Sequence, residues 1–265
     1  MSIQITTAFV EQYKGNVEHL VQQKGSRLRD CVSIETVTGE NAFFEQIGSV
    51  AAVERQSRHE DTVRIDTPHS RRRVSLADYV FADLIEDEDR IRMLIDPTGE
   101  YAKACANAMG RSMDDVIIAA ADGTAQTGKT GSTSTAYSAA MTVDVQVGIS
   151  PAADTGLNVG KLRAAKKNLD ANEADDNDRV MVINAMQLQN LLAETEITSS
   201  DFNTVKALVA GEVNSFMGFQ IKRTERIGVD SNADDKVLYW QKSGMKLAVG
   251  KEPTVKITER ADKNY

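Results

Sequence analysis

The longest periodic stretch of the sequence runs from Asp96 to Asp122 and predicts a single long α-helix. Asp96 is a suitable N-cap, and Pro97 then occupies the first helical position, where its missing N–H costs nothing. Gly123 follows at a natural C-terminal stop. At 1.5 Å per residue the helix would be about 40 Å long, which favours a strut with other layers packed along it over an ordinary core helix. Apolar residues at three- and four-residue spacing predict its inward face: Tyr101, Cys105, Met109, Met113, Val116, Ile117 and Ala120.

The composition bounds what the rest of the chain can be. Its 265 residues are 41% hydrophobic and 26% charged, as in globular proteins with a sizeable core. The formal net charge of −8 argues against a general electrostatic affinity for nucleic acid. No apolar run approaches the roughly 18 residues of a membrane span, and the start lacks the pattern of a secretory signal. Cys31 and Cys105 are predicted to be free thiols, and no histidine lies near either, so a zinc site is not expected.

The first 75 residues predict an arm followed by a protruding loop. In residues 1–37, a short amphipathic helix is predicted over positions 9–21, in a piece too small to own a core. From Gly39 to Ser75, the strand-like runs Val50–Val53 and Thr62–Ile65 are separated by dense charge and predict a two-stranded loop. Such a loop either pairs with another subunit or is simply solvated. Six arginines face interleaved acids, which favours pairing with protein carboxylates over nucleic acid: Arg55, Arg58, Arg64, Arg71, Arg72 and Arg73.

One segment matches a phosphate-binding motif. Gly123–Thr130 reads G-x-x-x-x-G-K-T, the P-loop pattern, in which Lys129 would reach a nucleotide phosphate. That chemistry needs a strand before the loop and a helix after it. Here the preceding residues are predicted helical, and ten of the thirteen residues 123–135 are Gly, Ser or Thr. We therefore predict a flexible loop and keep a P-loop NTPase as the alternative.

Two acidic runs are predicted to be solvated and not to bind metal. Residues 83–92 are expected to form an amphipathic approach to the long helix. Residues 170–178 hold five acids, but Asp175 and Met181 stand where a calcium loop requires Gly and Glu. The sequence therefore predicts no catalytic, cofactor-binding or metal-binding residues.

The remaining periodicities alternate between helix and strand and predict an α+β protein. Residues 158–228 can enclose a small core of their own. Predicted strands cover Met141–Val147, Arg179–Asn184, Phe216–Arg223, Val237–Trp240, Met245–Val249 and Thr254–Thr258, and predicted helices cover Asn158–Leu169, Ala185–Glu194 and Phe202–Val209.

The order of these segments resembles the major capsid proteins of tailed double-stranded DNA bacteriophages, which have the Hong Kong 97 type of fold. The phrases VSLADYVFADLIEDEDRIRML, VMVINAMQLQNLL, VNSFMGFQIKRTERI and KVLYWQKSGMKLAVG resemble the family's successive segments. The resemblance covers nearly the whole chain and implies an N-terminal arm (1–37) and an extended loop (38–75). It also implies a peripheral domain (76–157) with the spine helix 96–122, an axial domain (158–235) and a return to the peripheral domain (236–265).

The resemblance implies a structural protein, not an enzyme, that self-assembles into hexamers and pentamers of an icosahedral shell around packaged double-stranded DNA. It implies a virion location, assembly in the host bacterial cytoplasm, a portal, and no membrane. No lysine lies between Lys24 and Lys103, so the lysine–asparagine crosslinks of some relatives are not expected in the loop. We expect a non-covalent shell held by the arginine-rich loop or by a separate cement protein. Because no charged helical leader precedes the arm, a separate scaffolding protein is expected, and the ending ADKNY suggests a further strand lost from the C-terminus. An encapsulin-like cargo shell of the same fold stays open.

Overall fold

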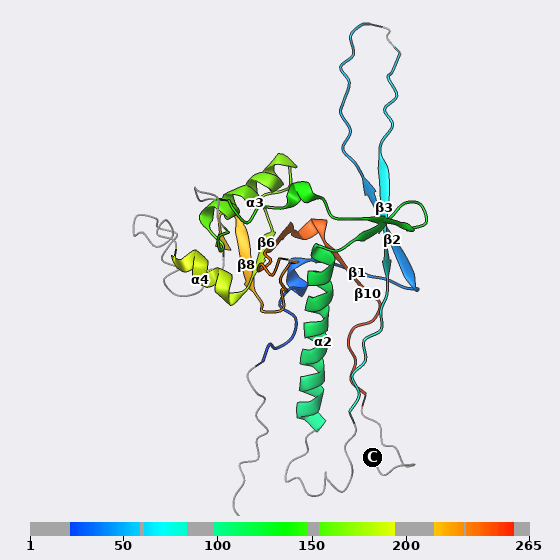
Figure 1. Ribbon diagram of the computed structural model, residues 1–265. Helices are drawn as coiled ribbons and strands as arrows, with labels where there is room; N and C mark the ends of the chain where they lie inside the picture. The colour runs from blue at the N-terminus through cyan, green and yellow to red at the C-terminus, as the bar shows by residue number, and fades with distance from the viewer. Residues whose placement is uncertain are drawn as a thin grey trace, which may run out of the picture. The chain divides into compact units, whose positions relative to one another are not determined.

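The structure is a computed structural model that describes residues 22–58, 61–83, 98–147, 154–193, 215–230 and 232–256 (Figure 1). The chain divides into two compact units. The first combines Met1–Ser26, Tyr79–Ser112 and Pro253–Tyr265, and the second combines Arg27–Asp78 and Met113–Glu252. The predicted helices at residues 9–21 and 202–209, and nearly all of the acidic run 83–92, lie outside the described residues. The domain boundaries predicted from the sequence stay a prediction.

The long helix is confirmed as α2 (Thr98–Ala121), 24 residues without interruption (Figure 1). Its predicted inward face is partly wrong, because Tyr101, Val116 and Ala120 are exposed, Tyr101 to 40% and Val116 to 38%. The residues buried on α2 are Gly110, Asp114 and Ile117. Gly110 and Asp114 have no apolar side chain, so hydrophobic periodicity could not identify them.

Each of these two residues is buried for a steric or polar reason. In the first unit, a Cβ on Gly110 would lie 2.5 Å from the backbone carbon of Gly25, so only glycine allows this close approach. In the second unit, the Asp114 carboxylate accepts hydrogen bonds from the backbone N–H groups of Arg27, at 3.0 Å and 3.2 Å, and Leu28, at 3.1 Å. These bonds satisfy a fully buried carboxylate.

A four-stranded mixed sheet forms the centre of the second unit, in the order β7-β8-β6-β9. Strand β6 pairs parallel to β8 and antiparallel to β9. All five residues of β6 are buried, because both of its faces are covered. The predicted strand at 216–223 is instead a tight hairpin, with Met217 and Gly218 at positive φ in its turn. The bounds are β6 (Arg179–Ile183), β7 (Ser215–Phe216), β8 (Phe219–Arg223) and β9 (Leu238–Gln241).

Two apolar clusters cover the two faces of this sheet. The first contains Met181 and Ile183 of β6 with residues of α3 (Val159–Ala171) and α4 (Ala185–Ala193). The second contains Val180 and Val182 of β6 with Ile117 of α2 and Trp240 of β9. The predicted cap of α3 is confirmed, since the Asn158 side chain accepts a hydrogen bond from the Lys161 N–H at 2.8 Å. Both helices lie where the periodicity placed them.

A second four-stranded sheet, antiparallel throughout, has the order β2-β3-β4-β5. Its strands are β2 (Asn41–Ile47), β3 (His69–Ser75), β4 (Ala125–Thr127) and β5 (Thr133–Thr135). The predicted hairpin therefore exists, but its strands are not the predicted runs 50–53 and 62–65, which have no strand. Local β-propensity in those runs is not backed by burial, so the pairing stays at the base of the loop.

A third sheet joins β1 (Ser33–Thr36) and β10 (Lys246–Val249) in parallel. The predicted strand Met141–Val147 is wrong. A short 3-10 helix, η3 (Ala139–Met141), precedes irregular chain in which the predicted alternation of half-buried and exposed residues is nevertheless present. Residues 254–256 of the last predicted strand also have no strand, and the other two lie outside the described residues.

Candidate functional site

The β2–β3 hairpin places the three consecutive arginines of the predicted contact set on one strand. Because side chains alternate along β3, Arg71 and Arg73 share one face of the sheet and Arg72 lies on the other. Arg71 forms an ion pair with Glu45 on β2, at 2.5 Å between Nη2 and Oε1. Its guanidinium also lies 5.4 Å from the centre of the Phe43 ring. Arg71 is therefore held within the hairpin, and only Arg72 is exposed.

Arg73 is covered by the turn between β4 and β5. A Cβ on Gly131, which has φ +65°, would lie 2.5 Å from the Arg73 Cβ, so glycine is needed at this close approach. The Arg73 Nε is buried and has no hydrogen-bond partner among the described residues. The N–H group at this nitrogen is therefore a donor without an acceptor among the described residues.

Beyond the paired strands the chain continues as a loop over residues 48–68 (Figure 1). A hydrogen bond of 2.8 Å from the Gly48 N–H to the Pro68 carbonyl closes its base. Every described residue of this loop is exposed, including Arg55, Arg58 and Arg64 of the predicted contact set. The structure therefore separates the six arginines into three on β3 and three in the loop.

The loop also exposes large apolar side chains that the sequence prediction did not include among the contact candidates. Their exposed fractions range from 45% to 59%, for Val50, Val53, Val63 and Ile65, and Ile47 at the end of β2 is 69% exposed. The signal that could have identified them is the recurrence of Val and Ile within a run that has too little chain for a core. Large exposed apolar residues gathered in one segment mark an interaction surface.

The P-loop match has the wrong architecture for a phosphate cradle. Helix α2 precedes it, strand β4 lies within it, and strand β5 follows it. Lys129 is exposed in the turn of the β4–β5 hairpin, and its carbonyl accepts a bond from Arg71. The strand–loop–helix order that aims a helix N-terminus at phosphates is absent from this described segment. The prediction of a flexible loop for residues 123–135 is also wrong, because the segment forms this hairpin.

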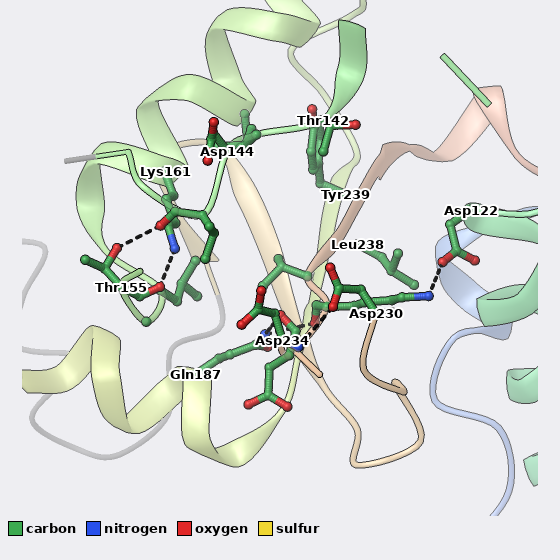
Figure 2. A pocket seen from close by; sticks show the side chains of 18 of the residues that line it. Asp122, Thr142, Asp144, Thr155, Lys161, Gln187, Asp230, Asp234, Leu238 and Tyr239 are labelled. Carbon is green, nitrogen blue, oxygen red and sulfur yellow. Dashed lines mark hydrogen bonds and ion pairs between the residues drawn. The ribbon is translucent and has the colours of Figure 1, made fainter. Parts of the chain in front are cut away.

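A hollow of about 980 Å³ lies beside β9, between α3 and the loop that precedes β9 (Figure 2). Lys161 lies on one side of it, and its Nζ donates to the Thr155 carbonyl at 2.5 Å. Burial lowers the pKa of Lys161, while Asp234, Asp144 and Asp154 oppose that shift. In the described parts of the chain, no group of His, Cys, Asp or Glu is placed to hold a metal ion. The hollow therefore offers polar walls but no assembled metal-binding set among the described residues.

Two further findings concern the cysteines and the described helices. Cys31, which is buried, and Cys105, which is half-buried, are free thiols, as predicted. Burial raises the pKa of the Cys31 thiol, which makes it a poor nucleophile. Among the described helices, none combines the length and apolar character needed to span a bilayer.

Comparison with protein families identifies one family. A family model described as phage capsid protein matches residues 5–265. No curated protein sequence matches the chain. The capsid of Ralstonia phage GP4 is similar in structure, with a TM-score of 0.66 and 12% identity over 97% of this chain and 87% of that one.

Two further solved structures are similar at comparable levels. A structure of Mycobacterium phage Che8 has a TM-score of 0.64 and 14% identity, over 96% of this chain and 88% of that chain. The capsid structure of cyanophage P-SCSP1u has a TM-score of 0.62 and 18% identity, over 90% and 79%. At these identities the likeness establishes the fold.

Proposed function

We propose, from the premise that this chain belongs to the phage capsid protein family, that it builds its shell by laying the loop 48–68 of each copy on a neighbouring copy. The chain is a structural protein of the phage capsid, with the α+β fold of Hong Kong 97 type that its sequence predicts. We propose hexamers and pentamers as its assembly units. Closure of such rings needs distinct heterologous contacts on each copy.

The observation that carries this proposal is the exposure of apolar side chains along the loop. Fully burying one Val or Ile side chain is worth about 1.5–3 kcal/mol, and an isolated two-stranded hairpin is marginal in water. A neighbouring copy supplies the burial that the loop does not find within the described part of its own chain. Many copies of this contact act together in a shell, so each one can be modest.

We assign the arginines to the polar rim of this contact. Arg55, Arg58 and Arg64 would pair with carboxylates of the neighbouring copy, and Arg72 is exposed for the same purpose. The Arg73 Nε is buried and has no partner among the described residues. A small shift of this side chain on assembly would let it donate to a carboxylate or carbonyl of the neighbouring copy. Arg71 contributes by fixing the hairpin, since Glu45 already holds its guanidinium.

Other partners follow from the same role. We propose a portal, a separate scaffolding protein, packaged double-stranded DNA held without sequence specificity, and assembly in the host bacterial cytoplasm. A cement protein would add to the loop contacts. The net charge of −8 suits a wall that encloses DNA without binding it tightly.

The experiment that tests the loop contact replaces four of its apolar residues by serine: Val50, Val53, Val63 and Ile65. We expect this variant to stay folded but to form few or no shells in electron micrographs, because the contact between copies loses its apolar core. The matched control, V50I/V53I/V63I/I65V, keeps all four positions apolar and is expected to assemble. Shells formed by the serine chain in normal yield would contradict the proposal.

The bond type of the shell is tested separately. Because no lysine lies between positions 24 and 103, the loop has no amine for an isopeptide bond. Purified shells are expected to give a single band at 28.9 kDa in a denaturing gel. A ladder of multiples of that mass would show covalent welding and refute the non-covalent shell.

We also propose that the chain is not an enzyme. We expect the purified chain to show no nucleotide hydrolysis, and the Lys129→Ala variant to behave identically. A hydrolysis activity that disappears in Lys129→Ala would restore the P-loop alternative.

A further inference from the structure

Helix α3 has a charge arrangement that is unfavourable within its own copy. Four cations lie along its length and the acids begin only at its C-terminal end, with Asp170. A helix is stabilised by the opposite layout, with anions near its N-terminus and cations near its C-terminus. Arg163 lies three and four residues before Lys166 and Lys167, and each such like-charge pair costs about 0.2–0.5 kcal/mol, whereas Asp170, at the same spacings after them, is held by Arg179. The cations are Lys161, Arg163, Lys166 and Lys167.

The acids that follow α3 are held in a fixed shape by a buried arginine. Arg179, 2% exposed, donates to the carbonyls of Asp175 at 2.8 Å and Ala174 at 2.5 Å. It also forms ion pairs with Asp170 at 2.6 Å and Asp176 at 3.0 Å. Because Arg179 binds the backbone carbonyls of this turn, the residues of the turn present their side chains to solvent. We name residues 172–178 the acidic turn.

Several charges of both regions have no ion pair among the described residues. Lys166 and Lys167 on α3 have none, and neither do Glu173 and Asp175 of the acidic turn, both of which are exposed. Several other cationic side chains of the second unit are instead paired within the chain, as in Arg71–Glu45, Arg226–Asp115, Lys236–Asp122 and Lys246–Glu35.

We propose that the acidic turn of one copy contacts the Lys166–Lys167 surface of α3 on the next copy around a ring. This inference rests on the proposed self-assembly and names one of its contacts. A head-to-tail ring needs two different, complementary patches on the same rigid body. Helix α3 and the acidic turn lie on one such body, because α3 packs on β6 and Arg179 of β6 anchors the turn (Figure 1). The partner copy offsets the charge arrangement that is unfavourable in the single copy.

The test uses two chains with reversed charges. The helix-reversed chain carries K166E/K167E, and the turn-reversed chain carries E173K/D175K. In a ring of either chain alone, each contact faces like charges, so the yield of assembled rings is expected to fall by about tenfold or more. A chain with all four substitutions restores opposite charges at every contact and is expected to assemble as the unaltered chain does. It also serves as the control for folding, because it contains every altered side chain.

Mixing the two reversed chains gives a sharper readout. In an alternating ring, the unaltered turn of one chain meets the unaltered helix of the other, and both reversed surfaces also meet. Alternation closes around six copies but not around five. The equimolar mixture is therefore expected to form six-membered rings and sheets or tubes made of them, with few five-membered rings and few closed shells.

The outcomes separate this contact from the self-assembly on which it rests. Failure of the unaltered chain to assemble would overturn the self-assembly, and this contact with it. Normal assembly of both reversed chains would overturn the contact alone. So would failure of the four-substitution chain or of the mixture to regain rings, when urea unfolding shows each chain to be as stable as the unaltered one. Association of the unaltered chain is expected to weaken as sodium chloride is raised, since exposed charge pairs are screened.

Discussion

The region built around β6 and the β2–β3 hairpin differ in where their interactions are completed. All five residues of β6 are buried, and the Arg179 side chain at its start has four partners within the same copy. In the hairpin, β2 has no fully buried residue and ends on the exposed Ile47, and the loop beyond it exposes four more large apolar side chains. In the ion pair of the hairpin, the Arg71 side chain is 36% exposed and the Glu45 side chain is 64% exposed.

If the loop contacts a neighbour as proposed, this difference separates what a copy does for itself from what it does for its neighbours. Stability within the isolated chain is concentrated where burial and hydrogen bonding are complete, and the hairpin contributes little of it. In a capsid protein that division is useful, because the folded region can form first and the loop can bury its apolar side chains later, on a neighbouring copy. The comparison fails if a change in the hairpin unfolds the isolated copy as readily as one beside β6.

The largest effect is expected from shortening a buried aromatic side chain. Phe219→Ala removes a fully buried ring whose centre lies 6.4 Å from that of Tyr239 in an edge-on contact. We expect the free energy of unfolding to fall by about 3–5 kcal/mol, because the side chain is lost from a packed core and leaves a cavity. Urea unfolding of the unassembled chain measures the change.

The matched control is Phe43→Ala on β2, whose ring is 41% exposed and contacts Arg71. Its loss is expected to cost less than about 1 kcal/mol. Equal costs for the two substitutions would show that the hairpin has a core of its own, and would remove the distinction between the two regions.

A smaller effect is expected from removing a buried guanidinium. Arg179→Met leaves the carbonyls of Ala174 and Asp175 and the carboxylate of Asp170 without their donors, at a cost of roughly 2–3 kcal/mol. Arg71→Met in the hairpin breaks an exposed ion pair and is expected to cost less than about 1 kcal/mol. The same urea titration compares the two arginines. A larger cost for Arg71→Met would reverse the comparison.

The two regions also differed in how well their structures could be predicted from the sequence. Beside β6, apolar period and burial agree, so the strand Arg179–Asn184 and the helix beginning at Asn158 were predicted to within about two residues. In the hairpin, Val50–Val53 and Thr62–Ile65 have the composition of strands, but no sheet face is available to bury them within the described chain. The pairing formed instead at Asn41–Ile47, which the charge pattern did not indicate.

Polar residues with structural roles were the other omission. Asp114 and Arg179 are buried because specific backbone groups need their charges, and no periodic pattern of apolar residues reports this. Met141–Val147 shows the converse, since its alternation correctly predicted which side chains face inward but not the missing ladder of backbone bonds. Period two reports one-sided burial, whereas a strand also needs a partner.

The smallest effect concerns a single hydroxyl in the region built around β6. The Tyr239 hydroxyl donates to the Met141 carbonyl and accepts from Asn168 Nδ2 at 3.1 Å. Tyr239→Phe is expected to lower the free energy of unfolding by about 1 kcal/mol near pH 8. Tyr79→Phe, in which the altered ring is half exposed, is the matched control and is expected to change little.

The cost of Tyr239→Phe is expected to shrink at alkaline pH, because burial raises the pKa of Tyr239 above its ordinary value of 10. Below pH 10 the phenol is neutral in both the folded and the unfolded chain, and its stabilising contribution is complete. As the pH rises through 10, the unfolded chain loses the proton first, so that contribution is lost as the pH approaches the folded pKa. Phenylalanine has no proton to lose. Urea unfolding of both chains at pH 8 and pH 10.5 measures the difference, and a cost that grows with pH would show that the phenolate is the favoured form in the fold.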